Sequence, residues 1–403
     1  MAVIMPYLVQ KLLSLGCNIR IFLTYGSETW TLNKKDQATL KLFESLKQIF
    51  RVVHEEGFGE DTTINFINYM RNMTESCAEL SNLTFPSGFL FGAGTSAFQI
   101  EGAWNESGKG VSVMDTMFRS GEAAIDNSNA DIACDSYNKY QEDIAIAKEL
   151  KLDFYRFSIA WSRILPTGFL NVINQDGVDY YNNLINGLLA VGIEPRVTIY
   201  HFDLPQSIDH LGGWNNPKII GYFTDFADLL FSLYGDRVKT WFTINQPHAI
   251  CTQLNTLDAT QPTGITEYLC TENMLKSHAR IYHLYKIKYR WWQRGKIGII
   301  LNLEFPIPAT NSAADIEAAE RKRLFDLHLN EALKAIHEDG VNLFAYSAWS
   351  LMDNFEFFDG YTTKFGLFQV DFDSPNRTRT AKDSVAFYRN VIETRRLDDY
   401  CLH

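Results

Sequence analysis

Apolar positions from residue 89 onward alternate between two patterns. Short apolar runs are typical of strands buried on both faces, and apolar residues three and four apart mark one side of a helix. The predicted strands are Phe89–Gln99, Phe154–Trp161, Glu194–His201, Val238–Asn245, Lys296–Leu303 and Val341–Trp349. The predicted helices are Ile132–Leu150, Gln175–Val191, Pro217–Tyr234, Glu272–Arg290 and Asp315–His337.

Regular alternation of strands and helices implies parallel β-α-β units in an α/β fold. Six strands are recognisable, whereas a closed (β/α)8 TIM barrel has eight. The last helix is unusually long and divides into two near Arg321–Arg323, so we place a deletion near residues 321–324. The prediction is an incomplete (β/α)8 barrel with about six of eight units. Six strands would leave two open sheet edges, which favour self-association.

Residues 1–57 do not share this alternation. The stretch Asp36–Val53 carries apolar residues on one face of an amphipathic helix. Residues Tyr25–Leu32 resemble the tail of reverse transcriptases from non-LTR retrotransposons, which implies a fused remnant without polymerase carboxylates. The alternative is a helical extension unique to this chain. The predicted organisation is a fused helical segment at 1–57, a linker at 58–84 and the partial barrel at 85–396.

The composition argues against several classes of binding partner. The 403 residues carry a net charge of −11, which argues against a nucleic-acid surface, because phosphate binders need basic patches. No run of about 18 apolar residues predicts a membrane span, so we expect no membrane partner, and the N-terminus lacks the basic region of a signal peptide. No group of His, Cys and Asp has metal-ligand spacing, so we expect neither a metal nor a cofactor. An aromatic content of 14% suits both a large core and a sugar-binding cleft.

Six cysteines in a chain of this length do not form a disulfide scaffold. Cys251 and Cys270 flank one loop, and a bond between them would contribute about 3 kcal/mol. The pattern leaves two interpretations open, a disulfide between this pair or two free buried thiols.

Long motifs in the barrel region resemble glycoside hydrolase family 1, the β-glucosidases and myrosinases, and most of all its insect members. The resemblance runs from about Phe85 to Ile392 in family order. It implies a retaining glycosidase on a (β/α)8 barrel. Members are commonly secreted, but without a convincing signal peptide we assign no location. The motifs are Phe89–Trp104, Tyr155–Ile164, His201–Pro205, Thr243–Pro247 and Trp349–Glu356.

Retaining hydrolysis needs two carboxylates about 5–5.5 Å apart. In this family the acid/base is the Glu of an Asn-Glu-Pro motif, and the position here is Gln246. An amide neither donates nor accepts a proton in this pH range, which removes general acid/base help. The family nucleophile, the Glu of a Thr-Glu-Asn-Gly motif, belongs between Leu303 and Val341, where no such motif occurs. Glu272 lies in a similar tripeptide but precedes Met274 and opens a predicted helix, so we reject it as the nucleophile.

The resemblance also implies a retained sugar-binding shell. Gln99, His201 and Asn245 would hold hydroxyls, Trp349 would stack beneath the sugar ring, and Glu356 would bind the 4- and 6-hydroxyls. Phe357 stands where the family usually has Trp, so an indole N–H donor is missing. The implied ligand is a β-glucoside or a thioglucoside, since plant myrosinases also carry Gln at the acid/base position.

Three functions therefore remain. The first is a β-glucosidase-family hydrolase by descent that is inactive as written. The second is an active β-glucosidase or thioglucosidase whose gene model is incomplete. The third is a non-catalytic sugar-binding pseudoenzyme. In each of them the recognition of sugar depends on the same shell of residues.

Overall fold

The computed structural model describes residues 20–25, 28–33, 83–254, 264–303, 328–330, 332–338 and 340–397. The predicted helix Asp36–Val53, most of the predicted 58–84 linker and the predicted deletion near 321–324 lie outside these residues.

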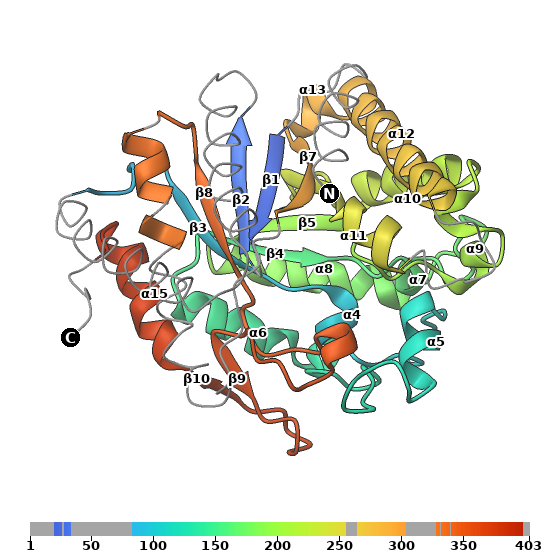
Figure 1. Ribbon diagram of the computed structural model, residues 1–403, viewed down its shortest axis with the longest axis horizontal. Helices are drawn as coiled ribbons and strands as arrows, with labels where there is room; N and C mark the ends of the chain where they lie inside the picture. Colours follow the sequence, from blue (N-terminus) through green and yellow to red (C-terminus); the bar gives the residue numbers. More distant parts are fainter. Residues whose placement is uncertain are drawn as a thin grey trace, which may run out of the picture.

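Six parallel strands form the curved sheet that the pattern predicts, so the incomplete (β/α)8 barrel is confirmed (Figure 1). Their order around the barrel, β8-β3-β4-β5-β6-β7, follows the chain once β8 is placed beside β3. The bounds are Leu90–Gly94 for β3, Phe154–Ser158 for β4, Glu194–Tyr200 for β5, Thr240–Asn245 for β6, Lys296–Leu303 for β7 and Ala345–Trp349 for β8.

A hairpin from the N-terminal segment occupies the gap between β7 and β8 (Figure 1). Its strands are β1, Arg20–Tyr25, and β2, Glu28–Asn33, which pair antiparallel with each other. β1 runs parallel to β7, with Tyr25 level with Leu303, and β2 runs antiparallel to β8. The strand order is thereby closed. The expectation of two open edges is wrong, because backbone groups on both edges pair with the hairpin. Neither of these strands was predicted from the sequence.

Helices cover the outside of the sheet, as Figure 1 shows for α8, α10 and α12. The main core lies between helices and sheet: Trp241 of β6, for example, packs edge-on against Phe231 of α10 at 5.0 Å. The bounds are Ala97–Ile100 for α4, Val113–Arg119 for α5, Ser136–Glu149 for α6, Trp161–Ile164 for α7, Gln175–Ala190 for α8, Gln206–Asp209 for α9, Ile219–Tyr234 for α10, Pro247–Ala249 for α11, Ile265–Lys288 for α12, Arg290–Gln293 for α13 and Asp383–Thr394 for α15.

Two predicted strands end earlier than the apolar pattern indicates. The chain turns into α4 after β3, so Gln99 lies on a helix and not at a strand end. It also turns into α7 after β4, which places Trp161 at the first position of that helix. A short apolar run does not distinguish a buried strand from a buried helical turn, which explains both errors.

A small two-strand sheet lies between β8 and α15 in the chain. It pairs β9, Phe368–Val370, with β10, Arg379–Ala381. The sheet packs beside the segment that follows β8, where Lys382 forms an ion pair of 2.6 Å with the buried Asp353. It therefore braces the loop that carries Glu356.

Candidate functional site

Polar side chains gather at the carboxyl ends of the parallel strands, which we call the sugar mouth. His201 follows β5, Asn245 ends β6 and Trp349 ends β8. The His201 and Trp349 rings stack with centroids 5.6 Å apart and planes 15° apart. Asn245 Nδ2 lies 3.4 Å from His201 Nε2. Active sites of β/α barrels lie at this end, so the structure brings the three predicted residues together in the expected place.

Gln99 and Glu356 form the other half of the mouth. Gln99 Nε2 donates to Glu356 Oε2 at 3.1 Å and to Asn354 Oδ1 at 2.7 Å. Trp349 also forms a side-chain hydrogen bond with Glu356. Glu356 therefore links the Gln99 half to the Trp349–His201–Asn245 half. These residues form one connected set, which we call the five-residue shell: Gln99, His201, Asn245, Trp349 and Glu356.

The Glu356 carboxyl is unusual because its Oε1 is buried and has no hydrogen-bond partner among the described residues. Burial raises the pKa of Glu356 to about 8, although hydrogen bonds from Trp349, Gln99 and Asn354 work in the opposite direction. A buried acceptor without a partner is costly, so this oxygen is suited to receive a donor from a ligand.

Two residues of the shell, Asn245 and His201, are in contact with Arg156 of β4. Its Nη2 donates to Asn245 Oδ1 at 2.6 Å and lies 3.4 Å from His201 Nδ1. Burial lowers the pKa of Arg156 to about 9. Burial, and secondarily the Arg156 charge, hold the pKa of His201 well below its usual value, so His201 is neutral near pH 7.

The sequence did not indicate that Arg156 and Asn354 contact the shell. A usable signal existed for Arg156, because a charged residue in a fully buried strand needs polar partners. Asn354 had no comparable signal, since its contact to Gln99 spans 255 positions.

Gln246 directly follows β6, at the position where a carboxylate was expected. Its backbone N–H donates to the Ile300 carbonyl at 2.9 Å, beside a register shift between β6 and β7. Its backbone is left-handed, with φ 46° and ψ 63°. Such conformations cost energy in non-glycine residues and often occur at functional sites. The backbone therefore presents an amide side chain at the position that sequence reasoning assigned to the acid/base.

Phe357 follows Glu356 and lies within an aromatic cluster. Its ring stacks on Phe98 at 6.0 Å and contacts Phe202 at 5.3 Å. The side chain therefore packs beside the shell and offers a flat apolar surface without a polar donor.

Glu272 is an exposed residue of α12 and is not part of the sugar mouth. It forms an exposed ion pair of 2.9 Å with Lys276 one turn further along α12. The prediction that Glu272 opens its helix is wrong, because α12 begins at Ile265, where the Gly264 N–H is capped by Glu267. The predicted absence of a nucleophile concerns residues between Leu303 and Val341, and 304–327 lie outside the described part. It stays a prediction.

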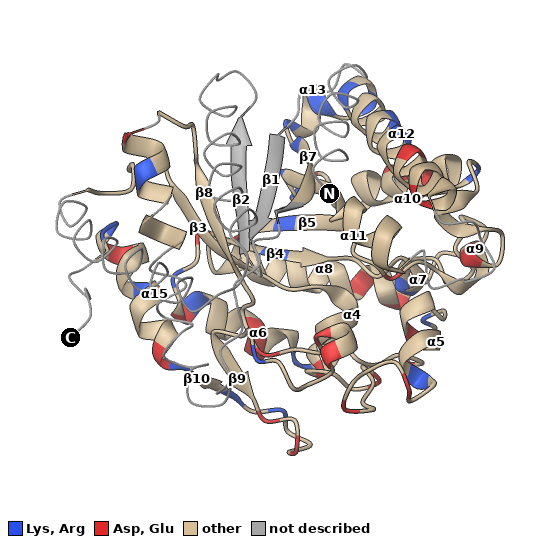
Figure 2. Cartoon of the chain, in the orientation of Figure 1, with Lys and Arg blue, Asp and Glu red and all other residues tan. Residues whose placement is uncertain are grey.

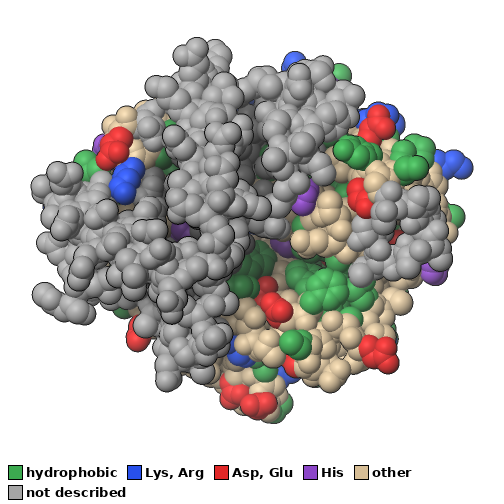
Figure 3. Space-filling view, viewed as in Figure 1, with side chains coloured by type: hydrophobic (Ala, Val, Ile, Leu, Met, Phe, Trp, Pro, Cys, Tyr) green, Lys and Arg blue, Asp and Glu red, His purple; other side chains and the backbone are tan. Residues whose placement is uncertain are grey.

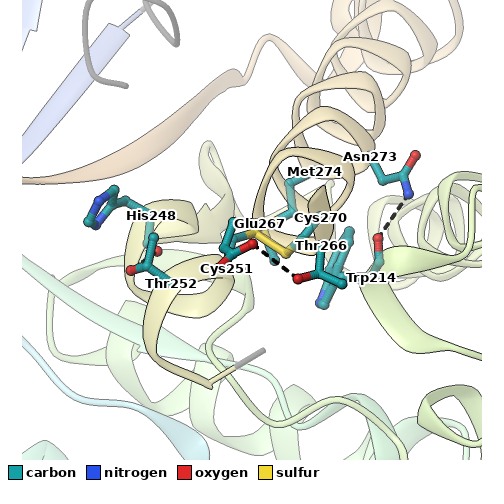
Figure 4. The surroundings of a disulfide bond; sticks show 9 residues. All are labelled: Trp214, His248, Cys251, Thr252, Thr266, Glu267, Cys270, Asn273 and Met274. Atoms are coloured by element: carbon teal, nitrogen blue, oxygen red, sulfur yellow. Dashed lines mark hydrogen bonds between the residues drawn. A yellow bond between two sulfur atoms is a disulfide. The ribbon is translucent and has the colours of Figure 1, made fainter. Parts of the chain in front are cut away.

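A disulfide between Cys251 and Cys270 resolves the alternative left open by the sequence (Figure 4). The Cα atoms are 5.6 Å apart, and both residues are buried. The bond ties the turn of helix after α11 to α12, so it anchors the segment that starts at Gln246.

We expect the double variant Cys251→Ser/Cys270→Ser to have a free energy of unfolding about 3 kcal/mol lower than that of the parent protein, since the bond closes a loop with a sequence separation of 19. Urea unfolding of both proteins measures the difference. A reducing agent should destabilise the parent protein and leave the variant unchanged; equal stability of parent and variant would contradict the anchoring role.

Two broader features of the described residues bear on ligands. No group of three or more His, Cys, Asp or Glu in this part of the chain is arranged to hold a metal ion. Among the helices described, none combines the length and apolar character needed to cross a bilayer.

Comparison with known proteins places this arrangement in a family. The model of "Glycosyl hydrolase family 1" matches residues 81–328 and 323–397, two segments that meet where the deletion was predicted. Myrosinase 1 of Brevicoryne brassicae is 32% identical over 460 aligned positions, covering 77% of this chain and 98% of the relative. Because 77% of 403 residues is about 310, about 150 of those positions are gaps in this chain.

Other proteins that this chain resembles are β-glucosidases. The non-cyanogenic beta-glucosidase of Trifolium repens is 46% identical over 267 residues, 62% of this chain and 54% of the relative. Among solved structures, a beta-glucosidase from Thermotoga maritima in complex with castanospermine superposes with a TM-score of 0.70 at 28% identity, covering 78% of this chain and 100% of that one. On the strength of the matched segments and the shared barrel, the chain belongs to glycosyl hydrolase family 1.

Proposed function

We propose that this protein binds β-glucosides through the five-residue shell and hydrolyses them negligibly. The observation that carries the proposal is the connected set itself. Gln99, Glu356, Trp349, His201 and Asn245 contact one another at the sugar mouth, while the neighbouring acid/base position holds Gln246. Recognition and turnover use different residues in retaining glycosidases, so one function can persist without the other.

Chemistry at the mouth supports binding. A sugar presents hydroxyl donors and acceptors above an apolar ring face. The unpartnered Oε1 of Glu356 can accept a hydroxyl, and the half-buried Trp349 ring can contact the apolar face. Neutral His201 and the Asn245 amide add groups that both donate and accept. None of these interactions requires a catalytic acid or a nucleophile.

The test measures affinity and turnover on the same protein. Calorimetry with an aryl β-glucoside should give saturable binding, and product release should be at most about 10⁻⁴ of the rate of an intact relative. Glu356→Ala should abolish binding, whereas Glu272→Gln, an exposed carboxylate on α12, should leave it unchanged. A cooperatively folded protein without affinity, or one with turnover like an intact β-glucosidase, would refute the proposal.

Ligand binding should depend on pH through Glu356. Its carboxyl has a pKa raised to about 8, so it is mostly protonated at pH 6 and ionised above pH 8. If the ionised form accepts the sugar hydroxyls, affinity for a neutral sugar such as glucose should rise roughly 100-fold between pH 6 and pH 9, following the ionised fraction. Titration calorimetry across this range measures the slope, and Glu356→Gln should remove it. An affinity independent of pH would show that Glu356 does not bind the sugar in this way.

A second candidate, thioglucoside hydrolysis, is favoured by Gln246 and by the similarity to aphid Myrosinase 1. A thiolate leaving group needs little protonation, so the amide would be tolerated there. A nucleophile is still required. Release of glucose from a thioglucoside, without release from the matching O-glucoside, would establish this function.

The third alternative is an active enzyme whose printed sequence lacks two units. Sequencing of the expressed transcript across codons 321–324 decides it. Additional codons for two β/α units would replace the binding proposal by catalysis, and a transcript that reads as printed would exclude this alternative.

A further inference from the structure

A patch of basic and large apolar side chains covers the start of β7 and the helix turn before it. Along residues 286–296 every exposed side chain is either a cation or a large apolar group. Ile287 is 78% exposed, Trp291 77% and Trp292 46%. The cations are Lys286, Lys288, Arg290, Arg294 and Lys296. We call residues 286–296 the basal patch.

The charge of the basal patch differs from that of the whole protein, whose net charge is −11. Lys288 is compensated by an ion pair of 2.8 Å with Asp228 of α10. Lys286, Arg290 and Arg294 form no ion pair with any residue that the structure describes. Figure 2 shows several Lys and Arg positions, coloured blue along the ribbon, at α13 and the adjoining end of α12. In Figure 3 some basic and some hydrophobic atoms are visible at the upper edge of the molecule.

The exposed tryptophans belong to a segment that is held in place by buried, hydrogen-bonded residues. Tyr289, between them and α12, is buried and donates its hydroxyl to Asp228 at 2.7 Å. Gln293 is 1% exposed and donates to the Phe231 carbonyl at 2.8 Å. Buried residues therefore alternate with exposed ones along this turn. The exposure of Ile287, Trp291 and Trp292 results from a well-packed helix end and not from a loose loop.

The basal patch and the sugar mouth lie at opposite ends of the barrel. Lys296 begins β7 and pairs with Thr240 at the beginning of β6. Asn245, in contrast, ends β6 at the sugar mouth. A large surface that contacts the basal patch would therefore leave the mouth open to water.

We propose that the basal patch docks this protein peripherally onto a membrane surface containing anionic phospholipid. Exposed tryptophans and apolar side chains flanked by Lys and Arg are the composition of interfacial membrane contacts. The uncompensated cations match the negative surface potential of such a bilayer, which extends about one Debye length. The protein as a whole is acidic, so its remaining surface would be repelled by the negatively charged bilayer. Attraction would therefore be confined to the basal patch and would orient the molecule. The sugar mouth would then face the aqueous side.

Vesicle sedimentation tests the proposal with the full chain. The protein should sediment with phosphatidylcholine vesicles that contain about 30% phosphatidylserine and not with pure phosphatidylcholine, and salt at about 0.5 M should release it. Arg290→Gln/Arg294→Gln should weaken binding roughly 25-fold, about 5-fold for each cation. Trp291→Ser/Trp292→Ser should weaken it at least about 10-fold.

A matched control changes one exposed apolar residue and one exposed cation at the other end of the molecule. Ile125 is 75% exposed and its N–H donates to the Phe358 carbonyl, near the mouth, and exposed Lys218 immediately precedes α10. The variant Ile125→Ser/Lys218→Gln should sediment like the parent. Equal loss in the control, unaltered binding by the patch variants, or no sedimentation by the parent would overturn the proposal. So would a patch-dependent dimer, or patch-dependent binding of an RNA oligonucleotide without vesicle binding.

Discussion

Insertion of the two missing β/α units from an intact family member between Arg321 and Leu324, with residues 1–33 removed so that the inserted strands can pair with β7 and β8, and combined with Gln246→Glu, is expected to raise hydrolysis of an aryl β-glucoside by at least about 10⁴-fold. The combination restores both carboxylates of a retaining pair, one as nucleophile and one as acid/base. Acid/base help alone is typically worth 10²–10⁴-fold. Product release under saturating substrate measures the change.

The single changes separate the two roles. Gln246→Glu alone should raise the rate less than about 10-fold, because the acid has no nucleophile to assist. The insertion with Gln246 retained should act on a dinitrophenyl glucoside, whose leaving group needs no proton, and poorly on an alkyl glucoside. Full activity from Gln246→Glu alone would contradict this reasoning and would imply a nucleophile elsewhere in the chain. Glu28, the only carboxylate residue in β1 and β2, would then be examined first by Glu28→Gln.

Removal of residues 1–33 is expected to abolish cooperative unfolding or to lower the free energy of unfolding by at least about 3 kcal/mol. The hairpin pairs with β7 over five register positions and with β8 over two. Each backbone hydrogen bond contributes about 1 kcal/mol net, and unpaired edges also favour aggregation. Thermal and urea unfolding, with light scattering to detect aggregation, measure the loss. A variant that begins at Arg20 keeps both strands and serves as the control.

Cross-linking tests the register of the hairpin directly. Thr29 and Ser347 are antiparallel partners, so Thr29→Cys/Ser347→Cys should form a disulfide on mild oxidation. Thr31→Cys/Ser347→Cys is out of register and should not. A cross-link between two chains would show that a second copy supplies the hairpin, and no cross-link at all would contradict the pairing. A stable, monomeric protein without residues 1–33 would show that the hairpin is dispensable.

Much of the barrel could be predicted because its signals are local. β7 was predicted at its observed bounds and α8 to within one residue, since each has a clean period and a clear end. His201, Asn245 and Trp349 could be placed together as well, because parallel strands bring their carboxyl ends to one face. Gln99 belongs to the same site although its secondary structure was predicted wrongly, because the motif that contains it did not depend on that assignment.

The amino-acid sequence by itself determined the family, the number of recognisable β/α units and the amide at position 246. These are properties of residue order and short-range periodicity. Only the tertiary structure decided that β1 and β2 fill the gap between β7 and β8, since strand pairing across about 280 to 320 positions leaves no local pattern. It also decided the state of Glu356, whose raised pKa results from burial among residues distant in the chain. Burial and pairing are properties of packed neighbours, and neighbours in space become known only once the chain has folded.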